Sequence, residues 1–413
     1  MVRAQIFRAL RHGDFRRFFI AQAVSILGTW LQQIALSWLV YRTTGSAFLL
    51  GVVTLANQGP MLLVSPLAGL AADRFDRRRL LILTQSLAAG QAAVLAVLTF
   101  TGGLRTWHIV VLAVVYGIAN GLDTPVRHSL FVRLIGDRED LPNAIALNSF
   151  LMNAGRLIGP SIAGLMLLLV DEGVCFLLNA LSYLGTVWFA RSLPPQPVLA
   201  ARTQAGWAAS LAEAARYAWH QRVIRWALAL VASIGFFASS YTVLMPVLAK
   251  DVFGGGSETL GFLVGAAGLG ALVGTAYLAA RGRPRILARR LMYTATLAGL
   301  ALVAAGNAPS AGVAIACMIG VGFGIIVTAA SANMILQSIV TEDMRGRVVS
   351  FYAAAFMGIM PLGGFAAGSL ASHFGAPATI AVFGTCCAMA GLFIGLRLRH
   401  AARQIENGKT EPS

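Results

Sequence analysis

A few ionisable side chains interrupt long apolar stretches of this sequence, where they could handle protons, ions or a charged substrate. Asp123 lies four residues before Arg127, and Arg156 stands in a later apolar stretch. Charges inside a bilayer are costly and are usually functional, so we expect these residues to serve a transport mechanism. A local ion pair spanning one helical turn is the alternative for Asp123, and a structural contact with a backbone carbonyl is the alternative for Arg156.

Residue types that support catalysis or cofactor binding do not occur in suitable patterns. The cysteines at positions 175, 317, 386 and 387 lie in apolar runs without CxxC spacing, which predicts neither a metal site nor a disulfide framework. The sequence has no Walker A motif for ATP, and no cluster of His, Asp, Glu, Ser or Cys suggests an active site. We therefore expect no enzyme activity, no metal and no cofactor.

The elements that position these residues are predicted to be membrane-spanning helices. Of 413 residues, 57% are hydrophobic and 12% are charged, and the mean hydropathy is +0.74. Soluble domains are about one quarter charged, so the composition excludes a soluble enzyme, a coiled coil and a disordered chain. Apolar runs bounded by charge or by Gly, Pro and Asn predict twelve helices, over residues 18–41, 49–72, 80–101, 107–126, 144–170, 174–190, 225–249, 259–280, 287–306, 310–338, 348–372 and 377–396.

The positive charge of the chain predicts its orientation in the membrane. The sequence contains 32 Lys and Arg against 16 Asp and Glu, a net charge of +16. If the N-terminus is cytoplasmic, 28 of the 32 basic residues fall in segments on the cytoplasmic side, where basic loops are retained. We therefore expect both termini in the cytoplasm, and the charge requires no nucleic-acid partner.

The chain divides into two related halves. Leu147–Phe150 with Pro160 has a counterpart 201 residues later in Val348–Phe351 with Pro361, and a hydrophilic, proline-containing stretch lies between the halves. The predicted organisation is an N-terminal six-helix bundle (1–190), a cytoplasmic linker with an amphipathic helix (191–224), a C-terminal six-helix bundle (225–396) and a cytoplasmic tail (397–413). A repeat of this kind is typical of transporters that bind their substrate between two halves.

The strongest local motif runs from Gly69 to Arg79, between the second and third predicted helices, and reads GLAADRFDRRR. Together with the repeat and Pro160, it resembles the loop signature of the major facilitator superfamily, G-x-L-x-D-R-x-G-R-K or R, although Asp76 replaces the usual glycine. The sequences RLIGP at 156–160 and RGRV at 345–348 resemble more narrowly the bacterial branch that holds the enterobactin (siderophore) exporter and macrolide-efflux proteins. The resemblance covers the whole chain and implies an all-α polytopic membrane protein with twelve transmembrane helices in two pseudo-symmetric bundles.

The resemblance implies roles for particular residues. In this family the loop aspartate latches onto the start of the eleventh helix and joins a charge relay with an acid in the fourth helix. On this chain the gating and relay residues would be Gly69, Asp73, Arg74, Arg77, Arg78, Asp123 and Arg127. A charge run that only fixes topology is the alternative. The fifth predicted helix resembles the motif of drug–proton antiporters, with Ala163 as a departure from it, and the expected helix-packing residues are Gly155, Gly159, Pro160, Gly164 and Pro361.

Neutral polar residues recur at helical spacing along several predicted spans. They can face a water-filled pathway or hold helices together, and both interpretations remain open. The expected cavity residues are Gln22, Ser25, Thr29, Gln33, Asn57, Gln58, Asn153, Arg156, Tyr241, Gln337 and Tyr352.

These patterns lead to one expected function and two alternatives. We expect a monomeric, multi-pass secondary transporter of the bacterial inner membrane. It would export a small amphipathic molecule, either a siderophore or a macrolide-like drug, by alternating access and proton antiport. A transporter of lysolipids or other lipids (a flippase), and an exporter of another metabolite, are alternatives, since one fold serves many substrates.

Overall fold

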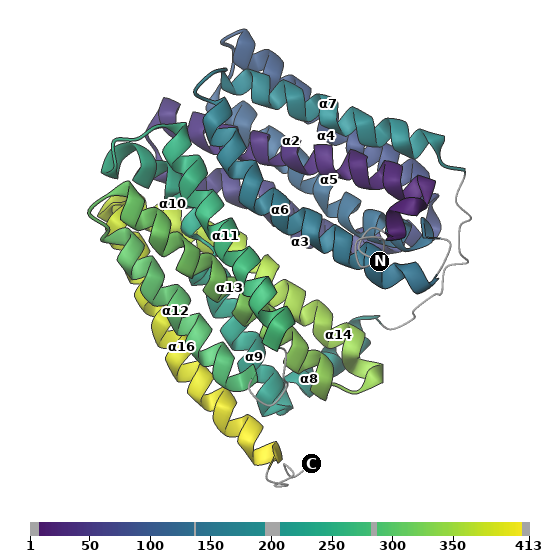
Figure 1. The fold of residues 1–413 in the computed structure, drawn as a ribbon, viewed down its shortest axis with the longest axis vertical. Coiled ribbons are helices and arrows are strands. Elements are labelled where there is room, and N and C mark those ends of the chain that lie inside the picture. Colours follow the sequence, from purple (N-terminus) through teal and green to yellow (C-terminus); the bar gives the residue numbers. More distant parts are fainter. Residues whose placement is uncertain (1–7, 136–137, 195–206, 282–286, 407–413) are drawn as a thin grey trace. The chain divides into compact units, whose positions relative to one another are not determined.

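The computed structural model describes residues 8–135, 138–194, 207–281 and 287–406. Within its helices, the side chains of residues 65–74, 128–129, 131–133, 138, 207–211, 281, 287 and 402–406 lie outside the described part. The described residues form helices and short connections, and none of them lies in a strand. They group into two units, each with its own internal packing (Figure 1).

Unit 1 comprises residues Met1–Gly45, Val52–Arg202 and Gly255–Gly265. Its elements are η1 (Arg8–Arg11), α2 (Gly13–Thr44), most of α3 (Ala47–Arg74), α4 (Arg77–Phe100), α5 (Thr106–Arg133), η2 (Arg138–Asp140), α6 (Leu141–Met166) and α7 (Glu172–Ser192). Helix α7 packs along α2 and α4, and α6 packs on α2. Helix α2 ends at Gly45, whose φ of 60° is the left-handed conformation that glycine adopts at low cost.

Aromatic and aliphatic side chains hold one end of unit 1 together. Phe15, Phe18, Leu81, Leu130 and Phe189 are almost fully buried in one cluster. The rings of Phe18 and Phe189 lie 5.7 Å apart in a tilted arrangement, a geometry favoured between aromatic rings. This cluster ties the start of α2 to the end of α7.

Unit 2 comprises residues Ser46–Gly51, Thr203–Gly254 and Ala266–Ser413. Its elements are α8 (Trp207–His220), α9 (Arg222–Ser233), η3 (Ile234–Ala238), α10 (Tyr241–Val247), η4 (Leu248–Val252), most of α11 (Ser257–Arg281), α12 (Leu287–Gly306), α13 (Ala311–Ile339), α14 (Glu342–Ala353), η6 (Ala354–Gly358), α15 (Met360–Phe374) and α16 (Ala376–Glu406). Helices α12 and α16 pack along each other (Figure 1), and α12 also packs on α13.

Two long helical stretches of unit 2 contain π-helical turns. One stretch, from Arg222 to Val252, includes α9, η3, α10 and η4, and the other, from Glu342 to Phe374, includes α14, η6 and α15. A side chain on Gly235 in η3 would collide with the carbonyl oxygen of Phe356 in η6. Glycine therefore allows the two π-helical turns to approach each other backbone to backbone.

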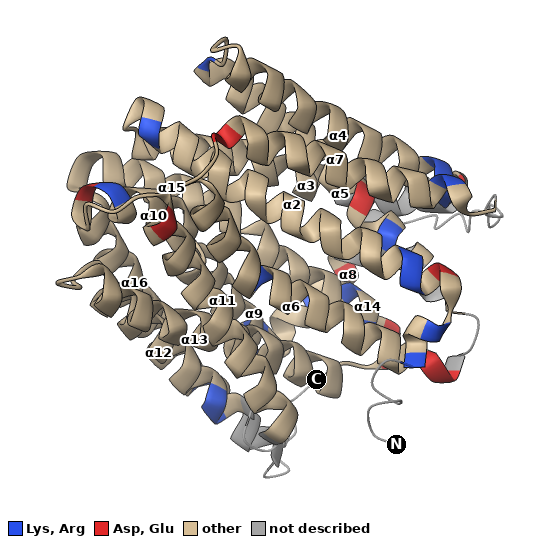
Figure 2. Cartoon of the chain, turned by 45° about the horizontal axis from the view of Figure 1, so that its top comes forward, with Lys and Arg blue, Asp and Glu red and all other residues tan. Residues whose placement is uncertain are grey.

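Ten helical stretches in the described part of the chain are long and apolar enough to cross a membrane. Helices α6 and α12 fall outside that set because polar residues lower their hydropathy. Helix α6 contains Asn148, Asn153 and Arg156, and α12 has Arg289 and Arg290 in its first turn. With α6 and α12 included, the long helical stretches of the described residues correspond one to one to the twelve predicted spans, and α6 ends at Met166, four residues before the predicted end of its span. The predicted all-α polytopic fold is confirmed. Charged residues lie mostly near helix ends (Figure 2), as expected for helices whose middles lie in lipid.

One complete helix, α8, lies in the described part of the predicted linker. Helix α8 lies between α7, which ends at Ser192, and α9, which starts at Arg222. Of the four residues predicted to form its apolar face, Ala214 and Ala218 are buried, and the side chains of Trp207 and Leu211 lie outside the described residues. Helix α16 ends at Glu406 and therefore includes the first ten residues of the predicted tail, 397–406. The division of the chain at 191–224 and 397 remains a prediction.

Candidate functional site

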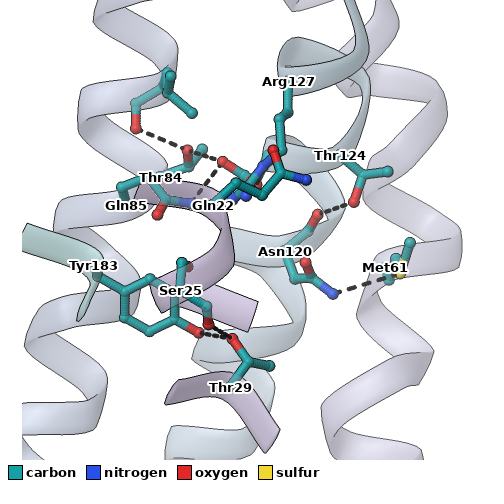
Figure 3. A network of polar contacts seen from close by, with 12 residues as sticks. Gln22, Ser25, Thr29, Met61, Thr84, Gln85, Asn120, Thr124, Arg127 and Tyr183 are labelled. Carbon is teal, nitrogen blue, oxygen red and sulfur yellow. Dashed lines mark hydrogen bonds and ion pairs between the residues drawn. The ribbon is translucent and has the colours of Figure 1, made fainter. Parts of the chain in front are cut away.

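Asp123 lies in a buried polar cluster of unit 1 with Arg127, Thr84 and Gln85, and Figure 3 labels these three partners. Asp123 as a whole residue is 4% exposed. One carboxylate oxygen accepts hydrogen bonds from Arg127, from Nε at 2.8 Å and from Nη2 at 2.6 Å. The other oxygen accepts from Thr84 Oγ1 at 3.0 Å and from Gln85 Nε2 at 2.8 Å. Four hydrogen bonds thus compensate a buried negative charge, as burial of a charge requires.

Two neighbouring helices supply this cluster. Asp123 and Arg127 are one turn apart on α5, which places them on the same helical face. Thr84 and Gln85 are adjacent on α4, which packs against α5. The predicted local pair of Asp123 and Arg127 therefore exists, and α4 adds two donors that the sequence interpretation did not include. Polar residues in the middle of the apolar α4 were the signal that could have revealed them.

The residues of the loop motif lie in different environments. Gly69, Asp73 and Arg74 belong to the end of α3, and their side chains lie outside the described residues, so the latch at Asp73 remains a prediction. Asp76, where the family has glycine, caps α4 by accepting a hydrogen bond from the backbone N–H of Arg78 at 2.9 Å. An aspartate at this position therefore has a local structural reason.

Two arginines of the loop motif, Arg77 and Arg78, lie in the first turn of α4. Arg77 is buried. Arg78 donates to the carbonyl oxygen of Ala190 at 3.1 Å and to that of Arg191 at 2.8 Å. Arg78 thus satisfies carbonyl groups at the end of α7, where a helix favours a positive charge, and is not brought to Asp123 by these bonds.

The polar stripe of α2 formed by Gln22, Ser25 and Thr29 makes contacts with two other helices. Gln22 donates to Asn148 of α6 at 3.1 Å, and the Thr29 hydroxyl lies 3.1 Å from that of Tyr183 in α7. Ser25 is buried beside them, and its carbonyl oxygen accepts from Thr29. Gln22 and Thr29, two of the expected cavity residues on α2, therefore join helices of unit 1. Figure 3 shows Thr29 beside Tyr183.

A buried ladder of side-chain amides joins α2, α4 and α7. Gln32 donates to Gln91 at 3.0 Å and accepts from Asn179 at 2.8 Å, and all three residues are buried. Gln33, the next residue of α2, is exposed. The ladder was not among the predicted site residues, although all three amides lie within apolar stretches of the sequence.

The remaining expected cavity residues have mixed environments. Asn57 and Gln58 on α3 are half-buried. On α6, Asn153 donates to the carbonyl oxygen of Ser149 at 2.8 Å, and Arg156 is exposed. No described residue forms an ion pair with Arg156, which lies near the middle of the 26-residue α6.

Unit 2 contributes three of the expected cavity residues. Tyr352 donates to the carbonyl oxygen of Ala329 at 2.9 Å, and Gln337 donates to Asn333 at 3.1 Å. Tyr241 is half-buried at the start of α10. The bond of Tyr352 joins α14 to α13 and leaves its ring stacked 6.4 Å from Phe356.

The expected packing glycines lie where helices approach closely. A side chain on Gly159 would meet Trp30 of α2 at 2.6 Å, and Gly155 lies against Ile26 of the same helix. A side chain on Gly164 would come within 2.9 Å of the Cα atom of Gly261, which belongs to the part of α11 within unit 1. Pro160 and Pro361 are both buried, the latter in the first turn of α15.

Two ion-pair groups of unit 1 were not predicted. Asp140 lies 2.6 Å from Arg8 Nε and 2.9 Å from His12 Nε2, which ties η1 and the residue after it to the start of α6. Arg42 at the end of α2 donates to the buried carboxylate of Glu172 at 3.0 Å. These pairs join residues about 130 positions apart, so no local spacing in the sequence identifies them.

Among the described residues, no group of three or more His, Cys, Asp or Glu side chains could hold a metal ion. The described site is therefore built from one buried carboxylate, arginines and neutral hydrogen-bonding groups. Such a site can hold a proton or a charge and can bind polar groups of a ligand.

Comparison with known proteins gives a match along the whole chain. A family model described as transmembrane secretion effector matches residues 4–413. The staphyloferrin A transporter of Staphylococcus aureus (strain NCTC 8325 / PS 47) is 28% identical over 402 residues, covering 95% of this chain and 98% of the relative. The multidrug efflux pump Tap of Mycolicibacterium fortuitum is 27% identical and covers 89% and 92%. The crystal structure of the nucleoside transporter NupG has a TM-score of 0.74 at 12% identity, with 93% and 99% covered, which shows a shared fold.

Proposed function

Because this chain belongs to the transmembrane secretion effector family of major facilitator transporters, we propose that it exports a siderophore-like amphipathic molecule across the bacterial inner membrane. The chain is a multi-pass membrane transporter. Its similarity to a staphyloferrin A transporter and to a multidrug efflux pump supports a small organic substrate. Export of a drug is the second candidate, supported by the efflux pump.

The observation that carries the proposal is the environment of Arg156. This arginine is exposed near the middle of a membrane helix and has no acidic partner among the described residues. A guanidinium facing lipid at that depth would be strongly unfavourable, so its exposure favours a water-accessible pathway. A planar guanidinium binds carboxylates and similar oxyanions through paired hydrogen bonds. Arg156 therefore favours a substrate with an anionic group over a neutral or cationic drug.

The Asp123 cluster supplies a group for proton coupling. Asp123 is a buried carboxylate within a predicted span, and it is paired with Arg127. Protonation of the carboxylate would weaken the ion pair with Arg127, and deprotonation would restore it. A cycle of this kind links proton movement to a rearrangement of α5 against α4. We assign proton antiport to this cluster as part of the proposal.

Close glycine contacts support alternating access. In unit 1, the first residues of α11 meet α6 at Gly261 and Gly164, and in unit 2, the first residues of α3 meet α15 at Gly51 and Gly368. Contacts made of backbone and few side-chain atoms can separate and re-form without repacking large side chains. The distribution of basic residues supports a cytoplasmic location of both termini.

Transport into inverted proteoliposomes tests the function. Full-length protein is reconstituted, a pH gradient is imposed, and uptake of a carboxylate siderophore, a macrolide and a fluorescent lysolipid is compared. We expect uptake of the siderophore that collapses when a protonophore dissipates the gradient. Uptake of the macrolide alone would make drug efflux the function, and movement of the lysolipid alone would make the protein a lipid transporter. Absence of all three would overturn the proposal.

A deletion strain provides the cellular test. Cells that lack the gene should retain a siderophore in the cytoplasm under iron limitation and should secrete it again when the gene is restored. The Arg156→Ala variant, expressed at the same level, should restore less secretion than the wild-type gene, because Arg156 is proposed to bind the substrate. Normal secretion by the deletion strain would exclude this chain as the exporter of that siderophore.

A further inference from the structure

Arg225 is held between two tryptophan rings at the junction of α8 and α9. Its guanidinium carbon lies 5.5 Å from the centre of the Trp219 ring and 5.4 Å from that of Trp226. One nitrogen, Nη1, donates a long hydrogen bond of 3.4 Å to the carbonyl oxygen of Trp219. A guanidinium has five N–H donors, so most of its hydrogen-bonding capacity remains available at a fixed position.

The position of this junction along the chain defines its depth in the membrane. Arg222 begins a stretch that is long and apolar enough to cross the bilayer. Trp219 lies three residues before that start and Trp226 lies one turn after it. Tryptophan is enriched at the headgroup level of membranes because its ring is apolar while its N–H is polar. Trp219 is 68% exposed, which suits a side chain at headgroup level.

The charges around this junction favour an anion. Arg216 is exposed on α8 one turn before Trp219, and among the described residues neither Arg216 nor Arg225 forms an ion pair. The acid on α8, Glu213, already binds Arg347 of α14 at 2.9 Å. Within the described part of the chain, two arginines without a carboxylate partner thus stand on either side of an exposed tryptophan in the sequence. Lipid phosphates are the anions that occur at headgroup level at high local concentration.

We propose that Arg216, Trp219 and Arg225 form a binding site for the phosphate headgroup of an anionic phospholipid of the phosphatidylglycerol type. Arg225 would bind the phosphate through its free N–H groups, Arg216 would add charge, and the exposed ring of Trp219 would pack on the glycerol region. Because α8 is also tied to α14 through Glu213 and Arg347, a bound lipid would hold the linker helix against the membrane. The site lies within unit 2 and is independent of the transported substrate.

Fluorescence quenching in nanodiscs tests the location and the headgroup preference. Wild-type protein and the Trp219→Phe variant are embedded in zwitterionic phosphatidylcholine that contains brominated phosphatidylglycerol or, in the control, brominated phosphatidylcholine. The difference between the two proteins isolates the signal of Trp219. We expect stronger quenching of that signal by the brominated anionic lipid. Equal quenching by both lipids would overturn the headgroup site, and no quenching by either would overturn its place at the membrane.

Native mass spectrometry of the full-length protein measures lipid affinity and tests the role of Arg225 in lipid binding. The Arg225→Gln variant should bind phosphatidylglycerol about fivefold more weakly than wild type, as expected for one basic residue near an anionic surface. The control is Arg397→Gln, because Arg397 lies 5.3 Å from the Phe393 ring at a comparable cation–π distance elsewhere in unit 2. Equal loss in both variants would indicate a general charge effect and overturn the site. Displacement of the lipid by inorganic phosphate would show an anion site that does not require a lipid, and would also overturn it.

Discussion

Arg127 donates two hydrogen bonds to one carboxylate oxygen of Asp123, from Nε at 2.8 Å and Nη2 at 2.6 Å. The Asp123 side chain is 6% exposed and that of Arg127 is 18% exposed, so water screens the pair weakly. Thr84 and Gln85 occupy the second oxygen. The carboxylate thus accepts four hydrogen bonds, and a change of its charge would alter its bonds to both α5 and α4.

Substitution of Asp123 should separate coupling from binding. In Asp123→Asn the side chain keeps its shape and loses its charge, so we expect gradient-driven transport to fall by at least about tenfold while substrate still binds. Thr84→Val is the control, because it removes one hydrogen bond and leaves the ion pair. The measurement is initial uptake with and without a pH gradient. Full gradient-driven transport by Asp123→Asn would remove Asp123 from the coupling mechanism.

The buried amide ladder should contribute to stability. Gln32→Ala breaks the bonds to Gln91 and Asn179, and we expect a loss of about 1–2 kcal/mol in the free energy of unfolding, in line with hydrogen bonds between membrane helices. Gln33→Ala is the matched control, since that side chain is exposed one residue away. Unfolding in mixed micelles measures both. Equal effects would show that the ladder adds nothing beyond helix propensity.

The contact between Gly159 and Trp30 should be sterically strict. A methyl group at position 159 would lie 2.6 Å from Cβ and Cγ of Trp30, so Gly159→Ala should destabilise unit 1 by about 1–3 kcal/mol. The second substitution Trp30→Leu should restore much of that loss. Gly185→Ala, at a glycine with open space around it, serves as the control and should be neutral. A Gly159→Ala protein with the wild-type midpoint of thermal unfolding would contradict this packing.

The pair of Arg42 and Glu172 should respond unequally to removal of its partners. The Glu172 side chain is 6% exposed and that of Arg42 is 52% exposed. Arg42→Ala leaves a buried carboxylate without its cation, whereas Glu172→Ala leaves an arginine that water can solvate. We therefore expect Arg42→Ala to lower the midpoint of thermal unfolding further than Glu172→Ala. The position of Glu172 in the first turn of α7 reduces the difference, because the helix N-terminus favours negative charge.

The role of Arg156 in substrate binding can be tested by comparing ligands of different charge. Arg156→Ala should weaken binding of an anionic substrate by about tenfold, as expected for loss of a charge-assisted hydrogen bond, and should leave a neutral ligand unaffected. Arg156→Lys should recover part of the loss, because it restores charge without the paired geometry. Isothermal titration with purified protein measures the dissociation constants. An unchanged constant for the anionic ligand would make Arg156 a structural residue.

Much of the architecture could be predicted because its signals are local in the sequence. Each span is a continuous apolar run, and burial in lipid requires every backbone group to be bonded within its own helix. The positions of the helices therefore follow from the local hydropathy of the sequence. The i,i+4 relation of Asp123 and Arg127 is equally local. Asp76 was recognised only as a departure from the family motif, and its role as the cap of α4 depended on the geometry of the turn.

The sequence by itself established a polytopic helical membrane protein with a related pair of halves, because hydropathy and repeated motifs need no knowledge of neighbouring helices. Only the tertiary structure decided which polar residues meet. Gln32 and Gln33 are equally polar neighbours in α2, yet one is buried in a ladder and the other is exposed. Arg78 bonds to the end of α7, and Thr84 and Gln85 of α4 bond to Asp123 of α5. These outcomes depend on how each helix is rotated about its axis, which the packing of a whole unit sets.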